Sequence, residues 1–258
     1  MKKIILGFMV LCSSIFAGEI TVAAAANVTY AMDKLVKEFN VANPDTKVVV
    51  TLSSSGKLVS QIENGAPFDI FMSADMKFPQ VLFDKKLTTT APVIYAQGAL
   101  AMLSSKELDY SKGINILNDI SISKIAVANP KTAPYGAAAI EAIKNAKIGN
   151  GVESKFVFAE SISQAVTYAI TAADVGFIAK SSLYEDNMTK YKENKNWITV
   201  DPKLYTSIDQ GIVIIDHSNS LVGLIKDNNK KEELKAFYDF ILGAKAKKIF
   251  EDYGYITK

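Results

Sequence analysis

The chain contains no arginine, so all 29 of its basic residues are lysines. An anion site in this protein would therefore lack the bidentate guanidinium fork that many phosphate and carboxylate sites use. Cysteine and histidine occur once each, as Cys12 and His217. This excludes a Cys/His cluster with zinc spacing. Removal of Cys12 on export would also leave the mature chain without a cysteine nucleophile and without an internal disulfide.

Sequence motifs of common enzymes are absent as well. The chain has no G-x-S-x-G elbow, no Walker A sequence and no G-x-G-x-x-G turn. Asp69 and Asp75 flank the end of an expected strand, where capping and solvation explain them better than acid/base chemistry does. His217 is expected to be satisfied or solvated rather than catalytic. We therefore predict that the protein is not an enzyme.

The first residues have the order of a secretory signal peptide. Two lysines follow Met1, an apolar run covers residues 4–16, and Ala17 supplies the small residue before the cut. The run is shorter than the ~20 residues that a bilayer span needs. We expect residues 1–17 to be removed on export, which places the mature protein in the periplasm. Lipid attachment at Cys12 is the alternative, and the leucine before Cys12 disfavours it.

The net charge of the expected mature chain does not favour binding to nucleic acid. Loss of the two leader lysines changes the formal charge from +2 to 0. No basic field is then left to attract nucleic acid. No second apolar run is long enough to cross a membrane. We expect a soluble monomer that does not bind nucleic acid.

Short apolar strands alternate with helical segments along the chain. The first set has strands at residues 20–23, 47–52 and 68–72, each followed by a segment with helical periodicity. A second set includes strands at 125–128 and 175–179. This βαβαβα order predicts a parallel sheet covered by helices. Two such sets without a flexible linker predict two α/β lobes, joined by crossing strands, with a cleft between them.

Small or polar residues stand at four strand-to-helix junctions, namely Ala26-Asn27, Ser54-Ser55-Gly56, Pro134-Tyr135-Gly136 and Ser161-Ile162. In open α/β sheets, ligands bind beyond the carboxyl ends of the strands. Helix starts at that edge offer free N–H groups and the positive end of the helix dipole. Asn27, Ser55 and Tyr135 would add side-chain donors. If the junctions converge, they surround a dianion with neutral donors.

The same residues also have a purely structural explanation. Asn27 and Ser55 are common N-cap residue types, and Ser161 followed by Gln164 fits a capping box. The Pro134-Tyr135-Gly136 triplet is also a plain turn sequence. The residue types alone leave an anion site and ordinary helix capping equally open.

Several ordered blocks resemble a known family. They are ITVAAAAN at 20–27, SSSGKL at 53–58, GAPFDIFMSAD at 65–75, AVANP at 126–130, PYG at 134–136, FYDFILG at 237–243 and IFEDYG at 249–254. In this order they resemble the periplasmic molybdate-binding proteins of ABC transporters over nearly the whole expected mature chain. The resemblance implies a two-lobed α/β solute-binding protein of type II. Each lobe has a mainly parallel sheet flanked by helices, and two crossing strands join the lobes. Residues 18–98 plus 211–258 would form the first lobe and residues 99–210 the second.

The resemblance also implies a ligand and its contacts. The protein would capture molybdate or tungstate, without a cofactor, for an ABC permease of the inner membrane. Asn27 would contribute a side-chain donor, Ser55 a hydroxyl, and Tyr135 and Ile162 backbone N–H groups. Many relatives have a tyrosine donor where this chain has Ala179, so one contact stays unassigned. Another tetrahedral oxyanion such as sulfate or phosphate is the alternative ligand, and a periplasmic enzyme is a more remote alternative.

One surface motif is independent of these arguments. Asn187-Met188-Thr189 is an N-glycosylation acceptor pattern, and Glu185 also suits bacterial oligosaccharyl transfer. The triplet is common by chance, which explains it better than modification does.

Overall fold

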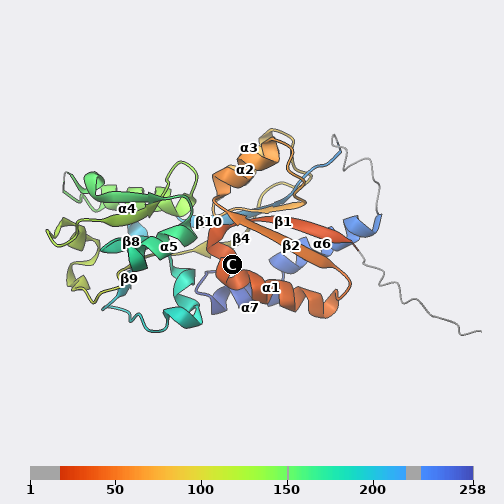
Figure 1. Ribbon diagram of the computed structural model, residues 1–258. Helices are drawn as coiled ribbons and strands as arrows, with labels where there is room; N and C mark the ends of the chain where they lie inside the picture. Colours follow the sequence, from red (N-terminus) through yellow and green to blue (C-terminus); the bar gives the residue numbers. More distant parts are fainter. Residues whose placement is uncertain (1–17, 150, 219–227, 258) are drawn as a thin grey trace, which may run out of the picture.

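The computed structural model describes residues 18–149, 151–218 and 228–257. The expected signal peptide and Cys12 lie outside the described residues, so leader removal and lipid attachment stay predictions. The chain forms two lobes that lie side by side, each built on a five-stranded sheet with helices around it (Figure 1). This confirms the predicted two-lobed α/β architecture.

The first sheet has the strand order β2-β1-β3-β10-β4. Its strands are β1 (Glu19–Ala25), β2 (Lys47–Ser53), β3 (Ile70–Met72), β4 (Val93–Gly98) and β10 (Ile208–Ile214). β1 pairs in parallel with β2 and β3, whereas β10 is antiparallel to β3 and β4, so only β10 runs in the opposite direction. The helices of this lobe are η1 (Ala26–Val28), α1 (Thr29–Ala42), α2 (Ser55–Glu63), α3 (Lys77–Asp84), α6 (Asn228–Leu242) and α7 (Ala244–Asp252).

The second sheet repeats this arrangement with the order β7-β6-β8-β5-β9. Its strands are β5 (Leu100–Leu103), β6 (Ile125–Ala128), β7 (Phe156–Ala159), β8 (Val175–Ala179) and β9 (Trp197–Thr199). Here β5 is the reversed strand. Each sheet is therefore mixed, because the reversed strand forms two antiparallel pairs beside the two parallel pairs, while the remaining strands point the same way as predicted. The helices are α4 (Pro134–Asn145), α5 (Ile162–Thr171) and the short segments η2 (Tyr110–Asn118), η3 (Val152–Lys155), η4 (Lys180–Tyr184), η5 (Asp186–Met188) and η6 (Pro202–Leu204). Asn187 of the acceptor pattern is exposed in η5.

The chain crosses between the sheets in two places. β4 of the first sheet is separated from β5 of the second by a single residue, Ala99. The chain returns between η6 and β10, and the Tyr205 hydroxyl of this segment accepts a hydrogen bond from the Leu100 N–H at 3.0 Å. The return strand β10 pairs with β4, so the two crossing segments support each other. The domain boundaries predicted at residues 98 and 210 stay predictions.

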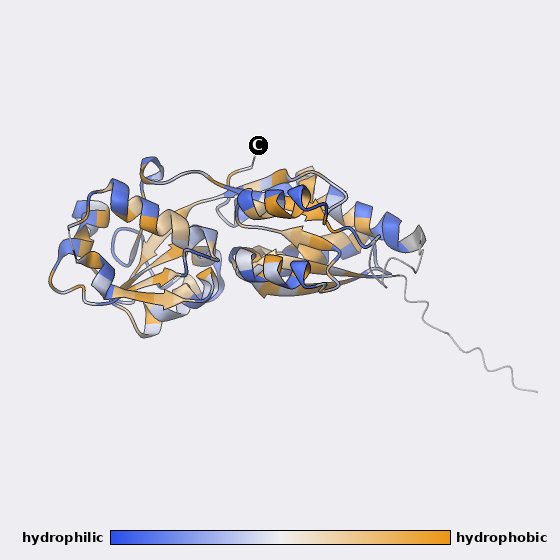
Figure 2. Ribbon diagram, turned by 90° about the horizontal axis from the view of Figure 1, so that it is seen from above, coloured by the Kyte–Doolittle hydropathy of each residue, from blue (hydrophilic) through white to orange (hydrophobic). Residues whose placement is uncertain are grey.

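Each lobe has its own apolar core. β6 and β8 are buried along their whole length, which is expected for central strands with helices on both faces. In the first lobe, the rings of Phe39 and Phe237 pack edge to face with centroids 5.0 Å apart. Apolar residues line the sheets, and the helices turn many of their hydrophilic residues outward (Figure 2). None of the helices in the described part of the chain is long and apolar enough to cross a bilayer.

Asp69 is buried, which corrects the expectation that it is solvated. Its side chain is only 1% exposed and lies 2.9 Å from the Lys230 ammonium and 3.4 Å from Nε2 of His217. Its carboxylate also accepts the Thr21 N–H at 2.7 Å. Burial alone would raise the pKa of Asp69, but hydrogen bonds from His217, Thr21 and Lys230 together hold that pKa below its usual value. Asp69 and Lys230 therefore form a structural ion-pair cluster that His217 contacts, consistent with the prediction that His217 is a satisfied histidine.

Candidate ligand-binding site

The four predicted site residues line one buried cavity between the lobes. Asn27 and Ser55 come from the first lobe, and Tyr135 and Ile162 come from the second. None of the four is more than 5% exposed. The other lining residues are Ala25, Ala26, Ser54, Ala74, Ala133 and Pro134. In this closed arrangement the cavity has room for about one water-sized sphere.

Each predicted residue stands in the first turn of a helical segment. At such positions the backbone N–H has no carbonyl one turn back to accept it. α2, α4 and α5 are 9, 12 and 10 residues long, and η1 continues directly into the 14-residue α1. The N-terminal ends of these helices carry partial positive charge. Since none of the described residues that line the cavity is charged, the arrangement suits an anion held by neutral dipoles.

The hydroxyl of Ser55 is held in place by the loop after β3. Its Oγ accepts the Ala74 N–H at 3.0 Å. The acceptor side of the hydroxyl is thus used by the fold, while its hydrogen stays available for donation. Ser55 is fully buried and lines the cavity. Its hydroxyl hydrogen is therefore uncommitted, and the role of Ser55 as a ligand donor stays a prediction.

The side-chain amide of Asn27 makes different contacts from those implied by the resemblance. Its Nδ2 donates to Oε1 of Gln210 at 2.9 Å and to the Tyr255 hydroxyl at 3.1 Å. Its Oδ1 is buried and has no hydrogen-bond partner among the described residues. Both side-chain donors are thus committed to neighbouring side chains. The donor that Asn27 has left is its backbone N–H, near the start of η1.

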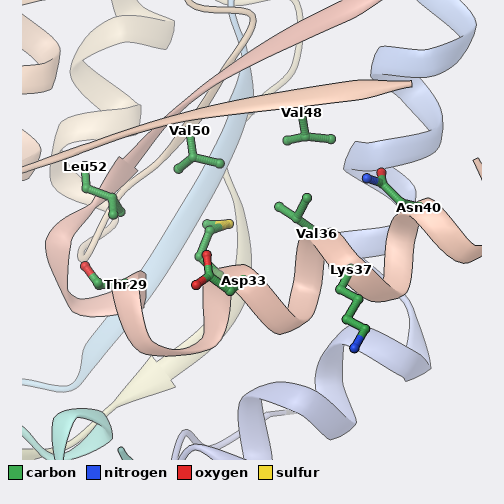
Figure 3. Close-up of a pocket in the computed structure, with 9 residues that line it drawn as sticks. Thr29, Asp33, Val36, Lys37, Asn40, Val48, Val50 and Leu52 are labelled. Atoms are coloured by element: carbon green, nitrogen blue, oxygen red, sulfur yellow. The ribbon is translucent and has the colours of Figure 1, made fainter. Parts of the chain in front are cut away.

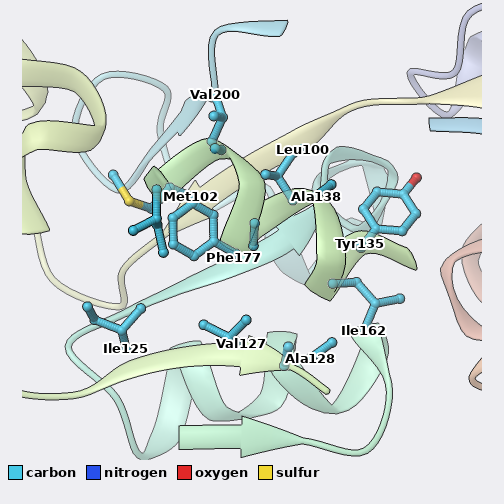
Figure 4. Close-up of a cluster of buried hydrophobic side chains, with 14 of the residues drawn as sticks. Leu100, Met102, Ile125, Val127, Ala128, Tyr135, Ala138, Ile162, Phe177 and Val200 are labelled. Carbon is cyan, nitrogen blue, oxygen red and sulfur yellow. The ribbon is translucent and has the colours of Figure 1, made fainter. Parts of the chain in front are cut away.

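Tyr135 uses its hydroxyl in the same network. The hydroxyl accepts a hydrogen bond from Nε2 of Gln210 at 3.1 Å, and Oε1 of Gln210 also accepts from the Tyr95 hydroxyl at 2.8 Å. The Tyr135 ring lies at the end of the second-lobe core with its hydroxyl pointing away from that core (Figure 4). Gly98 leaves room for this hydroxyl, because a Cβ at residue 98 would collide with it. Burial raises the pKa of Tyr135 well above its usual value, so the phenol stays protonated at neutral pH.

Gln210 links the two lobes, and sequence reasoning missed it. It is fully buried in the crossing strand β10. Through one amide group it contacts Asn27 and Tyr95 of the first lobe and Tyr135 of the second. A buried glutamine in a strand carries no local sequence signal, because its partners are 75 to 183 residues away along the chain.

The lobes also touch directly around the cavity, so this is a closed form of the protein. The contacts between them include Gly56 N–H to Thr132 O at 2.9 Å, Ser163 Oγ to Ala26 O at 2.8 Å, Ser181 Oγ to Asn27 O at 3.2 Å, and the ion pair Lys57–Glu160 at 2.8 Å. The ion pair is largely exposed. The three hydrogen bonds come from backbone and hydroxyl groups next to the predicted site residues.

Helix capping explains some of the polar residues at the junctions, but not all of them. Ser161 Oγ accepts the Gln164 N–H at 3.2 Å, which confirms the predicted cap of α5. Asp75 Oδ1 accepts the Phe78 N–H at 3.1 Å, so this carboxylate caps α3 as expected. Ser54 occupies the N-cap position of α2 but makes no side-chain capping bond.

A larger groove lies elsewhere. It has a volume of about 690 Å³, lies between α1 and β2, and contains none of the predicted site residues (Figure 3). Its lining residues are Thr29, Met32, Asp33, Val36, Lys37, Asn40, Val48, Val50 and Leu52. Among the described residues, no group of three or more His, Cys, Asp and Glu side chains is arranged to hold a metal ion.

Known proteins match this chain over nearly all of its length. A family model described as bacterial extracellular solute-binding protein matches residues 20–256. The molybdate-binding protein ModA of Azotobacter vinelandii is 34% identical over 253 residues, which cover 97% of this chain and 94% of the relative. ModA of Rhodobacter capsulatus is 33% identical, with coverage of 94% and 90%. The solved periplasmic molybdate-binding protein of Azotobacter vinelandii superposes with a TM-score of 0.81 at 27% identity, covering 93% of this chain and 99% of that one.

Proposed function

The chain belongs to the bacterial extracellular solute-binding proteins, and on this basis we propose that it captures molybdate and delivers it to an ABC permease of the inner membrane. The observation that carries the proposal is the convergence of four helix starts on one buried, uncharged cavity between the lobes. Two relatives that are 33–34% identical are named molybdate-binding proteins, which supports the choice of ion. Tungstate has nearly the same size and shape and should bind as well.

Binding would combine desolvation with lobe closure. An oxyanion entering the open cleft meets the helix starts of one lobe, and closure then brings those of the other lobe against it. The N–H dipoles and the Ser55 hydroxyl replace the water molecules around the ion without a neighbouring counter-charge. A cage fitted to the longer metal–oxygen bonds would leave sulfate with stretched hydrogen bonds. Sulfate should therefore bind more weakly.

The same proposal describes a monomer in the periplasm that has no cofactor and catalyses no reaction. The expected signal peptide and the extracellular family support export. The two side chains that a periplasmic enzyme would use, Asp75 and His217, both have structural partners. Asp75 caps α3, and His217 pairs with Asp69. The closed form of the lobes is the state that a permease would recognise.

A thermal-shift panel on the protein from Gly18 onward tests the function. Molybdate, tungstate, sulfate and phosphate are each added to the same preparation. A ligand present at 1,000 times its Kd stabilises the folded state by about 4 kcal/mol. For a chain of this size, that corresponds to roughly 8–16 °C in Tm. We expect shifts of this order with molybdate and tungstate and smaller ones with the other two. A larger shift with sulfate or phosphate would favour the alternative ligand, and no shift with any of the four would refute the proposal.

A further inference from the structure

One hydroxyl in the cavity has no role in the fold. Ser54 lines the cavity, is 3% exposed, and its buried Oγ has no hydrogen-bond partner among the described residues. Most buried side-chain polar groups in proteins are paired. We infer that the Ser54 hydroxyl donates a hydrogen bond directly to the bound oxyanion, as a ligand in addition to Ser55. This inference rests on the proposed function.

Helix capping would be the ordinary role of a serine at this position, and the geometry excludes it. Ser54 is the N-cap of α2 with φ −68° and ψ 145°, an extended conformation in which a serine side chain can accept an N–H of the first turn. Its backbone carbonyl accepts the Leu58 N–H at 3.1 Å, but its hydroxyl makes no capping bond. The adjacent serine, Ser55, is instead fixed by Ala74. The Ser55 hydroxyl is thus hydrogen-bonded within the protein, whereas the Ser54 hydroxyl lines the cavity without such a bond.

The composition of the cavity supports a hydroxyl donor at this point. Ala179 stands where the family pattern would place a phenol, and it does not line the cavity. The Tyr135 hydroxyl points to Gln210, and both N–H groups of the Asn27 amide are used by Gln210 and Tyr255. The lining side chains with an uncommitted hydroxyl hydrogen are therefore Ser54, Ser55 and Tyr135, and of these only Ser54 has no hydrogen-bond partner within the described residues. A second hydroxyl adds a donor without adding charge, so it fits a site that holds its anion with neutral dipoles.

The test compares Ser54→Ala with Ser53→Ala in calorimetric titrations with molybdate. Ser53 is the last residue of β2, is only half-buried and does not line the cavity, so it is a matched control. Loss of a hydrogen bond to a charged group should raise the Kd of Ser54→Ala roughly 10- to 150-fold. Ser53→Ala should keep the Kd of the unchanged protein. The Tm of ligand-free Ser54→Ala should be unchanged or higher, because no hydrogen bond within the protein is lost.

The possible outcomes separate this inference from the proposed function. Molybdate binding by the unchanged protein together with an unchanged Kd in Ser54→Ala overturns the inference alone. A fall in the ligand-free Tm of Ser54→Ala that matches its loss of affinity also overturns it, since the hydroxyl would then be structural. Absence of binding in the unchanged protein removes the proposed function and the inference with it. A crystal grown with tungstate gives a direct check, because a ligand oxygen should lie ~2.5–3.0 Å from Ser54 Oγ.

Discussion

Replacing Gly56 by alanine tests whether tight binding requires the contact between the lobes. Gly56 is the second residue of α2, and its N–H donates to the Thr132 carbonyl of the other lobe at 2.9 Å. An alanine Cβ would lie 2.9 Å from Cα of Thr132 and 3.0 Å from Cζ of Phe78. Carbon atoms pack at ~3.5–4.0 Å, so the contact with Thr132 requires the lobes to separate locally by roughly 0.6–1.1 Å.

The expected effects on affinity and on stability have opposite signs. The separation removes a hydrogen bond between the lobes that is worth about 1 kcal/mol, and it lengthens the hydrogen bonds to the ion. Together these effects should weaken binding by about 2 kcal/mol, which raises the Kd roughly 30-fold. In the ligand-free protein with its lobes apart, the methyl group no longer meets Thr132, and only the flexible ring end of Phe78 in the same lobe has to move slightly to admit it. Alanine then stabilises the helix by about 0.8–1 kcal/mol relative to glycine. The ligand-free Tm should therefore rise by roughly 2–4 °C.

Calorimetry with molybdate and a melting curve without it measure the two effects. Ser60→Ala is the control, because Ser60 lies one turn further along α2 on its exposed side. This control should leave the Kd unchanged. A Gly56→Ala variant that binds molybdate with the Kd of the unchanged protein would refute the closure argument. A lowered ligand-free Tm would show that the methyl group disturbs the fold rather than the closure.

Two further changes test the site and the ion-pair cluster. Ser55→Ala should weaken molybdate binding by about 1.5–3 kcal/mol in calorimetry, and an unchanged affinity would remove Ser55 from the site. Asp69→Asn should lower the free energy of unfolding by about 3 kcal/mol at pH 7. Because the pKa of Asp69 lies below its usual 3.8, its contribution is present above that pH and is lost as the pH falls through the folded-state pKa. Urea unfolding should therefore show a difference that shrinks from pH 4 to pH 2, and an equal difference at every pH would contradict this origin.

The strands were most predictable where the chain is apolar throughout. Residues 125–128 and 175–179 were predicted with the bounds of β6 and β8, since continuous apolar runs mark strands buried on both faces. The strand predicted at 68–72 begins only at Ile70. Asp69 explains the difference, because its carboxylate takes the Thr21 N–H that a longer strand would have paired. The partners that stabilise this buried carboxylate are distant in sequence and could not be inferred locally.

The candidate site was predictable at the level of the backbone and less so at the level of side chains. Asn27 and Ser55 were placed from junction composition and family resemblance, and both line the cavity. The contacts of Asn27 with Gln210 and Tyr255 span 183 and 228 residues, so no local sequence pattern predicts them. Capping preference also could not show that Ser54, at the N-cap position, would leave its hydroxyl unpaired.

The position of the cavity between the two lobes has a consequence for the rate at which a bound ion dissociates. Because the lobes are in contact around the cavity and its lining residues are buried, an ion inside would leave when the lobes separate. Its residence time is then set by how often the Gly56–Thr132 and Lys57–Glu160 contacts break together. Two ions that fit the cavity equally well should therefore dissociate at the same rate. A membrane partner that pulls the lobes apart would control delivery by changing the frequency of opening, without touching the ion.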